Sequence, residues 1–598
     1  MSLPSWKSNV GYEEGEHWVV SKMKTGYPRF FIHLIIQELE EAILKRYNRN
    51  DQKVMLFPSR ATASRCHRFL LDKAPSLKAE HVTIMSLVVR TPHANASAEI
   101  QHVLPSLFCV FFPHQYFDLA KQVWQHSGDG ISSRRAEFCL EALQEGLLYR
   151  EDEKIGPRCQ SLRSCRGPRR YQGTRFQNSI EGSSNSPSDS SSSSSEEIPI
   201  RRRKEYSQFV EERFGRNLNA IFASKAKLAI RRRIAGCLVE DTKVDRALAA
   251  PAQNSGRISG LTEAQVYLYP SGMSSIFNTY NVLLQHRKEK RKSICFGFPY
   301  IDTLKILEKW GPGCIFYGHG SGSDLDDLEN RLKRGERYLA LFTEFPSNPL
   351  LNSPDLQRIR SLADRYDFAV VVDETIGNFI NVNTLSLADV VVSSLTKIFS
   401  GDSNVMGGSA VYNPCQPRYA ELERTLSLEY EDNYWAEDAV FMERNSRDFV
   451  SRIERINGNA ETISDLLNSS PVPKAVYYPK YRPSKAEYDQ CRNIGGGYGG
   501  LLSVTFPRTE DAIIFFDELR VAKGPSLGTN FTLACPFVLL AHYRELDWVA
   551  QYGVDASLVR ISVGLEPRTE LTAAILDALK AVERNRLDRP TKLSGSDS

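Results

Sequence analysis

The sequence lacks the features that mark several large classes of protein. Its 11 cysteines contain no Cys-x-x-Cys pair, and their odd number and irregular spacing argue against a disulfide framework or a zinc site. No apolar run approaches the roughly 18 residues that cross a membrane. The acidic start, MSLPSWKSNVGYEEGE, has the pattern of neither a signal peptide nor a transit peptide. These absences predict a cytoplasmic protein in a reducing compartment, with no metal site and no membrane partner.

Composition describes an ordinary folded protein of several parts. Hydrophobic residues make up 41% and charged residues 25%, and a net charge of +4 on 598 residues indicates no charged partner. The chain is too long for one compact domain. We predict four segments, namely an α/β extension at 1–150, a linker at 151–205, a large domain at 206–430 and a smaller α/β domain at 431–598.

The predicted linker is the segment with the most biased composition. Its tract SSNSPSDSSSSSSEE cannot bury apolar area, so we expect it to be disordered. Basic clusters flank the tract, such as RRRK at Arg201–Lys204. We interpret these clusters as solvated charge in a linker, with a nuclear-import signal or a nucleic-acid-binding patch as the alternative.

The first 150 residues mix helical and strand patterns. Apolar residues recur at helical spacing in Ile32–Tyr47, and two further helices are predicted at Pro113–Gly128 and Arg134–Leu147. Strands are predicted at Gln52–Ser59 and Glu80–Val89. This pattern indicates a small α/β module, in which no catalytic constellation is apparent.

The large segment alternates regularly between strand and helix. Continuous apolar runs, among them SICFGF, CIFYGH, YLALFTEF, FAVVVD and ADVVVSSL, are separated by amphipathic helices. This alternation predicts a mostly parallel sheet that is covered on both faces. After about residue 430 the pattern changes. One long helix, Tyr434–Leu467, is followed in turn by the strand GGLLSVTF, the helix EDAIIFFDELR, the strand SLVRISVGL and a final helix, ELTAAILDALKAVERN.

Two strand ends carry the residues from which the chemistry is inferred. The run Val390–Leu395 ends just before Lys397, and the run FAVVVDE contains Asp373 at its end. A lysine can hold the aldehyde of pyridoxal 5′-phosphate (PLP) as a Schiff base, while an aspartate keeps the pyridine nitrogen protonated. Either residue alone would also fit a structural role at a strand end. The neighbouring motifs favour the cofactor.

Four further positions support this interpretation. In YPSGMSS, Gly272 stands at a predicted helix start that can bind phosphate. Tyr300 follows a strand and could stack on a planar cofactor or belong to the core. Asn348, in the turn SNP, could hold the cofactor ring oxygen, hold a substrate carboxylate or begin a loop. Arg560 lies in an apolar strand, where a carboxylate clamp or a structural ion pair would explain its charge.

The segments SGM, EFPSNP, VVDET, SSLTK and LVRISVGLE resemble, in order and spacing, the Cys/Met-metabolism family of PLP-dependent enzymes. The resemblance covers about 205 to 590. CFGFPYIDTLKILEK, GGYGGLLSV and the long N-terminal extension are similar to the fungal cystathionine γ-synthase branch of that family. The resemblance implies the aspartate aminotransferase-like transferase fold (fold type I) with an additional N-terminal α/β module. It also implies PLP as cofactor and a homodimer or homotetramer with shared active sites.

The resemblance assigns roles to individual residues. Lys397 would carry the cofactor and shuttle protons, Asp373 would pair with the pyridinium, and Tyr300 would stack on the ring. The groups that would hold the cofactor phosphate are Gly272, Met273, Ser394, Thr396 and, from the neighbouring subunit, Arg216. The groups that would fix the substrate are Asn348, Ser526 and Arg560. In RFGRNLN, Phe214 stands where the family has a tyrosine, which weakens a lyase more than a synthase.

The activity implied by the resemblance is γ-replacement. L-Cysteine would displace the acyloxy group from the γ-carbon of an O-acylhomoserine, succinyl or acetyl, to give cystathionine in transsulfuration and methionine biosynthesis. This is the O-succinylhomoserine (thiol)-lyase type of transferase. The alternatives within the family are an O-acylhomoserine sulfhydrylase, a cystathionine lyase and a γ-substitution enzyme with a carbon nucleophile. A non-catalytic regulatory scaffold with the same fold is the alternative of a different class.

Overall fold

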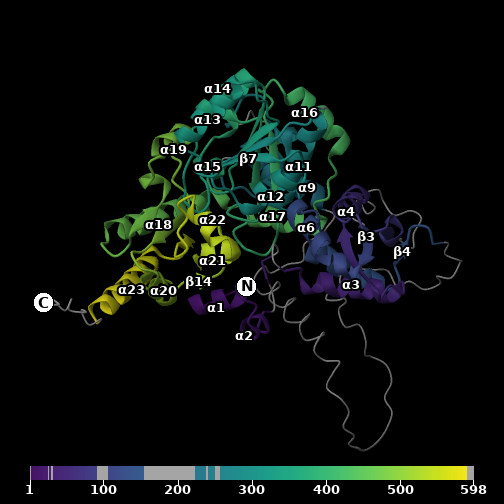
Figure 1. The fold of residues 1–598 in the computed structure, drawn as a ribbon, viewed down its shortest axis with the longest axis horizontal. Helices are drawn as coiled ribbons and strands as arrows, with labels where there is room; N and C mark the ends of the chain where they lie inside the picture. The colour runs from purple at the N-terminus through teal and green to yellow at the C-terminus, as the bar shows by residue number, and fades with distance from the viewer. Residues whose placement is uncertain are drawn as a thin grey trace, which may run out of the picture.

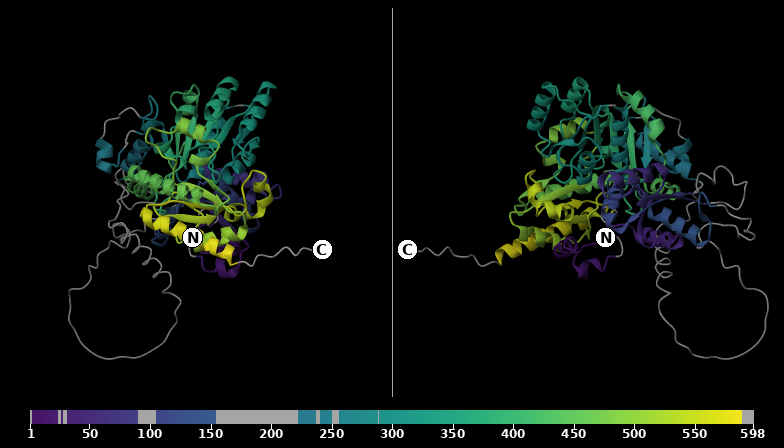
Figure 2. Two further views of the ribbon diagram at one scale, coloured as in Figure 1. Left: turned by 90° about the vertical axis from the view of Figure 1, so that its left-hand side faces the viewer. Right: turned by 45° about the vertical axis from the view of Figure 1, so that its right-hand side comes forward.

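The computed structural model describes residues 2–23, 26–27, 31–89, 105–153, 222–236, 240–249, 256–287 and 289–588. They form three sheets. Each sheet, together with the helices that pack on it, makes one of the three lobes visible in Figures 1 and 2. We call them the N-terminal module, the large lobe and the C-terminal lobe. Arg216 and most of the predicted linker lie outside the described residues. Within the described residues, no helix is long and apolar enough to cross a membrane.

The large lobe contains a seven-stranded sheet in the order β5-β11-β10-β9-β8-β6-β7. Its strands are β5 (Val266–Tyr269), β6 (Ser293–Phe296), β7 (Cys314–Tyr317), β8 (Ala340–Glu344), β9 (Ala369–Asp373), β10 (Val390–Ser394) and β11 (Gly408–Tyr412). The pairs from β7 to β10 are parallel, and only β11 is antiparallel to its neighbours. The prediction of a mostly parallel sheet is confirmed. β5 and β11 were not predicted. β11 follows β10 without an intervening helix, so it does not fit the alternation of strand and helix on which the prediction was based.

Helices cover both faces of this sheet. On one face α11 (Gly272–His286) and α12 (Ile301–Lys309) contribute Ile276 and Leu304 to a core shared with Val371 and Val392. On the other face α13 (Gly322–Lys333) and α14 (Leu356–Tyr366) belong to a second core that includes Val370 and Val391. Alternate residues of each strand therefore point into different cores, which explains why the strands are apolar throughout.

The C-terminal lobe has a five-stranded sheet flanked by long helices. Its strands are β12 (Ala475–Tyr477), β13 (Leu501–Thr505), β14 (Ala522–Lys523), β15 (Leu533–Pro536) and β16 (Val559–Ser562), in the order β12-β13-β16-β15-β14. The helices α20 (Thr509–Glu518) and α23 (Arg568–Leu587) match the predicted ones.

The single helix predicted over Tyr434–Leu467 is wrong, because two helices form, α17 (Ala436–Asn445) and α18 (Phe449–Ser469). At the break, the Arg452 side chain donates to the carbonyl oxygens of Asn445 and Phe399, both at 2.9 Å. Arg452 belongs to α18, and its buried guanidinium therefore gives a hydrogen-bond donor to the last carbonyl oxygen of α17, which has no partner within its own helix.

The N-terminal module is an antiparallel sheet with helices on it. Its strands are β1 (Gln52–Phe57), β2 (Thr83–Val89), β3 (Ser106–Pro113) and β4 (Leu148–Arg150), and its helices are α3 (Leu34–Arg46), α4 (Arg60–Lys73), α6 (Phe117–Ser127) and α7 (Ser133–Gln144). The two predicted strands and three predicted helices are present, whereas β3, β4 and α4 were missed. The module packs on the large lobe, where Phe69 stacks on Trp310 with 4.4 Å between ring centroids.

The first residues of the chain do not join that module. We call the described residues 2–23, 26 and 27 the N-terminal arm. Its helix α1 (Trp6–Glu13) lies beside α21 (Phe537–His542) of the C-terminal lobe, and α2 (His17–Val20) packs against α1 (Figure 1). The Trp6 amide donates to Asp517 at 2.7 Å.

Candidate active site

The carboxyl ends of the parallel strands define one edge of the large sheet. The neighbouring strands β8, β9 and β10 end there at Glu344, Asp373 and Ser394. β5 runs in the same direction, since β11 is antiparallel to both β5 and β10, so α11 begins at the same edge. Open parallel α/β sheets bind their ligands at this edge. The residues that the sequence singled out are therefore brought together by the sheet itself.

Lys397 lies three residues beyond β10, with 8% of its surface exposed. Its Nζ donates a hydrogen bond to Ser526 Oγ at 3.1 Å and another to Tyr27 Oη at 2.8 Å. The Ser526 loop lies directly against the lysine, because a Cβ on Gly528 would come within 2.6 Å of the Ile398 nitrogen. Gly528 also has a φ of +66°, which favours glycine. The predicted pair Lys397 and Ser526 is thus in contact.

Asp373 is half-buried at the end of β9. Desolvation of its carboxylate raises its pKa to about 6, although the Thr375 amide donates to Oδ1 at 2.9 Å. The Thr375 hydroxyl in turn accepts from the Ser394 amide at 2.8 Å, which ties the ends of β9 and β10 together. No cationic side chain among the described residues forms an ion pair with Asp373. A carboxylate in this environment fits a protonated pyridine nitrogen, because the opposite charge would offset its desolvation.

Glu344 is the site residue that the sequence analysis missed. It pairs in register with Asp373, and its carboxylate accepts the Tyr300 amide at 2.5 Å and the Asn348 amide at 3.0 Å. One side chain therefore positions two of the predicted residues. Burial, reinforced by the charge of Asp373, raises the pKa of Glu344 to about 8. The sequence did offer one signal for Glu344: it stands at the end of the apolar run YLALFTE, as Asp373 stands at the end of its own run.

Arg560, on β16, is 2% exposed and faces this edge from the C-terminal lobe. It donates to Asn348 Oδ1 at 3.1 Å and to the Pro525 and Ser526 carbonyl oxygens at 2.6 and 3.1 Å. Its guanidinium also lies over the Phe537 ring, 4.4 Å from the centroid. No carboxylate of the described residues pairs with it, so the structural ion pair considered above is not found there. A buried guanidinium that donates to neutral oxygens and has no carboxylate partner among the described residues suits a substrate carboxylate.

The start of α11 is built as an anion cup. Ser271 caps the helix by accepting the Ser274 amide at 3.1 Å, and the amides of Gly272 and Met273 lie in the first turn, where a helix has no internal acceptors. A Cβ on Gly272 would come within 2.6 Å of Ser394 Cβ, so glycine is required for this approach. The fourth predicted phosphate ligand, Thr396, exchanges hydrogen bonds with the backbone of Gly407 at 3.1 and 3.3 Å. These residues fit a phosphate group.

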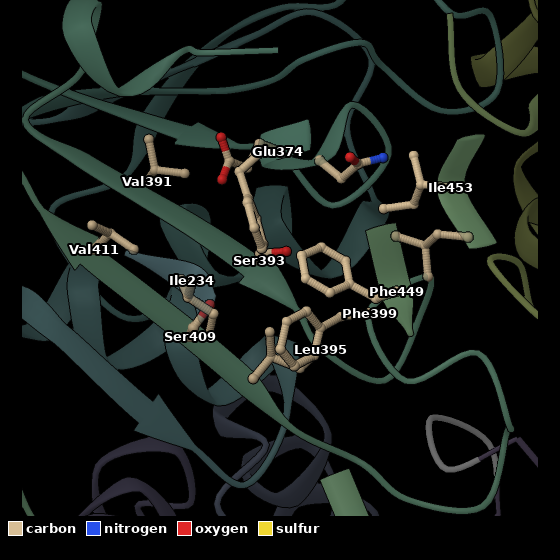
Figure 3. Close-up of a pocket in the computed structure, with 13 residues that line it drawn as sticks. Ile234, Glu374, Val391, Ser393, Leu395, Phe399, Ser409, Val411, Phe449 and Ile453 are labelled. Atoms are coloured by element: carbon tan, nitrogen blue, oxygen red, sulfur yellow. The ribbon is translucent and has the colours of Figure 1, made fainter. Parts of the chain in front are cut away.

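Figure 3 shows a small apolar cavity on the opposite face of β10. Ser393 and Leu395 line it together with Phe399 and Glu374, and its volume of about 10 Å³ holds about one water molecule. Glu374 is paired there with Arg257 at 2.7 Å. This cavity belongs to the core behind the site. It also confirms by alternation that Ser394 points to the other face of the sheet.

The fold and this edge define a PLP-dependent α/β enzyme, and comparison with known proteins specifies the family. The family model described as Cys/Met metabolism PLP-dependent enzyme matches residues 255–580, and that of the fungal trans-sulfuration enzyme, N-terminal domain, matches residues 35–132. The chain belongs to the Cys/Met-metabolism family of PLP-dependent enzymes. The predicted family, fold class and cofactor are thereby confirmed.

Similar proteins cover nearly the whole chain. A cystathionine gamma-synthase of Neurospora crassa is 50% identical over 606 residues, which are 98% of this chain and 96% of that protein. A cystathionine gamma-synthase of Saccharomyces cerevisiae is 38% identical over 94% of both chains. A cystathionine gamma-synthase-like enzyme of Amanita muscaria, iboG2, is 40% identical over 97% of this chain and 93% of its own length.

Proposed function

We propose that this protein is a PLP-dependent cystathionine γ-synthase, in which the thiol of L-cysteine replaces the acyloxy group at the γ-carbon of an O-acylhomoserine and the acyl group leaves as its carboxylate. The observation that carries the proposal is a continuous chain of contacts at the sheet edge. Lys397 bonds Ser526, the Ser526 carbonyl bonds Arg560, and Arg560 bonds Asn348. This chain joins an amine that can move protons to a guanidinium that can bind a carboxylate, as an amino-acid substrate requires. The half-identical enzyme of Neurospora crassa supports the specific reaction.

The residues present divide the work between cofactor and substrate. When bound, PLP supplies an electron sink for negative charge that develops at the substrate α-carbon. Asp373 would hold the pyridine nitrogen protonated, and the start of α11 would bind the phosphate. Arg560 and Asn348 would hold the substrate α-carboxylate, which fixes the α-carbon relative to Lys397 Nζ. The amine of Lys397 would then take the α-proton and return protons to the carbon atoms of the substrate during the replacement.

For the ester substrate we propose O-succinylhomoserine, with O-acetylhomoserine as the alternative. Purified enzyme is offered each ester with cysteine or with sulfide, and the products are identified by mass spectrometry. We expect cystathionine from at least one ester with cysteine. Homocysteine from sulfide with no cystathionine would identify a sulfhydrylase instead. Cleavage of cystathionine, with no synthesis from either ester, would identify a lyase.

We also propose a homo-oligomeric assembly and a cytoplasmic location. In the assembly, Arg216 would reach the phosphate site of a neighbouring subunit, as the family resemblance implies. The eight cysteines in the described part of the chain are free thiols, which supports a reducing compartment. The domain boundaries near residues 150, 205 and 430 are part of the same proposal.

A further inference from the structure

A phenol from the N-terminal arm contacts the amine of Lys397. Tyr27 Oη accepts a hydrogen bond from Lys397 Nζ at 2.8 Å, and the same nitrogen lies 4.7 Å from the centroid of the Tyr27 ring. The two residues are 370 positions apart in the sequence. No motif in the first 150 residues pointed to this contact.

The arm before Tyr27 is anchored on the C-terminal lobe. The Trp6 ring meets Phe516 edge to face at 6.0 Å, and Glu14 accepts a hydrogen bond from the Tyr543 hydroxyl at 2.6 Å. Leu3 and Val19 are buried in an apolar cluster of that lobe, with 2% and 5% of their surfaces exposed. These contacts fix the chain on one side of the site.

The chain after Tyr27 is anchored in the N-terminal module. Ile32 and Ile36 are buried in the core of that module, and α3 begins between them at Leu34. The module is held to the rest of the protein by the buried ion pair between Arg134 and Asp438, with 2.9 Å between nitrogen and oxygen. Tyr27 therefore lies in sequence between two anchors on different lobes.

The two oxygens on Lys397 Nζ constrain the direction of the third nitrogen position. The free amine of a lysine, which is the form that bonds an aldehyde, has two N–H donors and one lone pair. One is held by Tyr27 Oη and one by Ser526 Oγ, from opposite ends of the chain. The lone pair is then the remaining position, and it is the part of the nitrogen that forms the new bond. An amine held at two points loses less rotational freedom when it reacts than an amine held at one.

We propose that Tyr27 is a catalytic residue, whose hydroxyl holds the free amine of Lys397 in the orientation in which it reacts. The N-terminal arm is then part of the active site. This inference rests on the proposed function only in taking Lys397 as the lysine that bonds the cofactor.

The test is Tyr27→Phe in the full-length enzyme, because this change keeps the ring and removes only the hydroxyl. Tyr12→Phe is the matched control, since Tyr12 belongs to the same arm and packs against the apolar cluster that holds Leu3 and Val19. Cofactor-free enzyme is mixed with PLP, and covalent capture is followed by visible absorbance and by borohydride trapping. Thermal unfolding of each variant is measured in parallel.

We expect Tyr27→Phe to slow covalent capture of PLP about tenfold, as loss of one hydrogen bond to the amine predicts, and to lower kcat more than it raises KM. Tyr12→Phe should behave as wild type. Unchanged capture by Tyr27→Phe, or a change in unfolding temperature alone, would overturn the proposal. Faster capture would also overturn it, because Tyr27 would then obstruct the amine. Trapping of PLP in a Lys397→Ala variant at the wild-type rate would instead refute the proposed function.

Discussion

Replacement of Arg560 by lysine tests the substrate-binding half of the site. The change keeps a positive charge but removes the planar fork that now meets Asn348 Oδ1 and two carbonyl oxygens. A substrate carboxylate would lose at least one of its two N–H bonds. A hydrogen bond to a charged group contributes about 1.5–3 kcal/mol, and each tenfold change is about 1.4 kcal/mol. The KM for the O-acylhomoserine should therefore rise roughly 10- to 150-fold.

The assay compares two readouts for this variant. KM is measured at saturating cysteine, and PLP content is measured by absorbance after dialysis. PLP retention should be unchanged, because none of the bonds of Arg560 in the described structure goes to the start of α11. Arg586→Lys, at a distant ion pair with Asp511 of 3.0 Å, is the control. A KM within threefold of wild type, or loss of PLP, would refute the assignment.

Three further predictions concern the cofactor, the buried acids and the assembly. Asp373→Asn should retain part of its PLP but lose several orders of magnitude in kcat, since a neutral partner does not hold the pyridine protonated; a rate within threefold of wild type would make Asp373 structural. In cofactor-free enzyme, the raised pKa of Glu344 should make stability fall as pH rises from about 4.5 to about 8, because in this range the folded state keeps a proton that the unfolded state releases. Glu344→Gln should flatten that decline in thermal unfolding temperature, and an equal slope in both proteins would contradict the cause given. Mixed oligomers of Arg216→Ala and Lys397→Ala subunits should recover activity, because one site of a mixed dimer is intact; no recovery after demonstrated subunit exchange would remove the shared site.

Strands β6 to β10 of the large sheet could be predicted because each is a continuous apolar run between two cores, whereas β5 and β11 were not predicted. The same physics fixed the positions of Asp373 and Lys397, since parallel strands end at a common edge. The break between α17 and α18 could not be predicted, because it depends on Arg452 reaching carbonyl oxygens that are distant in sequence or lie across the break. Strand β3 was missed although SLFCVFFP is apolar throughout.

The site was predictable where residues follow strands and was missed where lobes meet. Asn348 and Arg560 were predicted from their segments and Ser526 from the family resemblance, and the structure joins the three residues through direct hydrogen bonds. Tyr27 has no local pattern that distinguishes it from other tyrosines of the chain. Its place on Lys397 depends on the docking of α1 on one lobe and of α3 in another, which are tertiary contacts.

The most direct test of the account is to identify the residue that bonds the cofactor. Purified enzyme loaded with PLP is reduced with borohydride and digested, and the peptide that carries the pyridoxyl group is sequenced by mass spectrometry. The account predicts a single modified residue, Lys397, in the segment SSLTKIFSGD. Modification of any other lysine, with Lys397 unmodified in active enzyme, would contradict it.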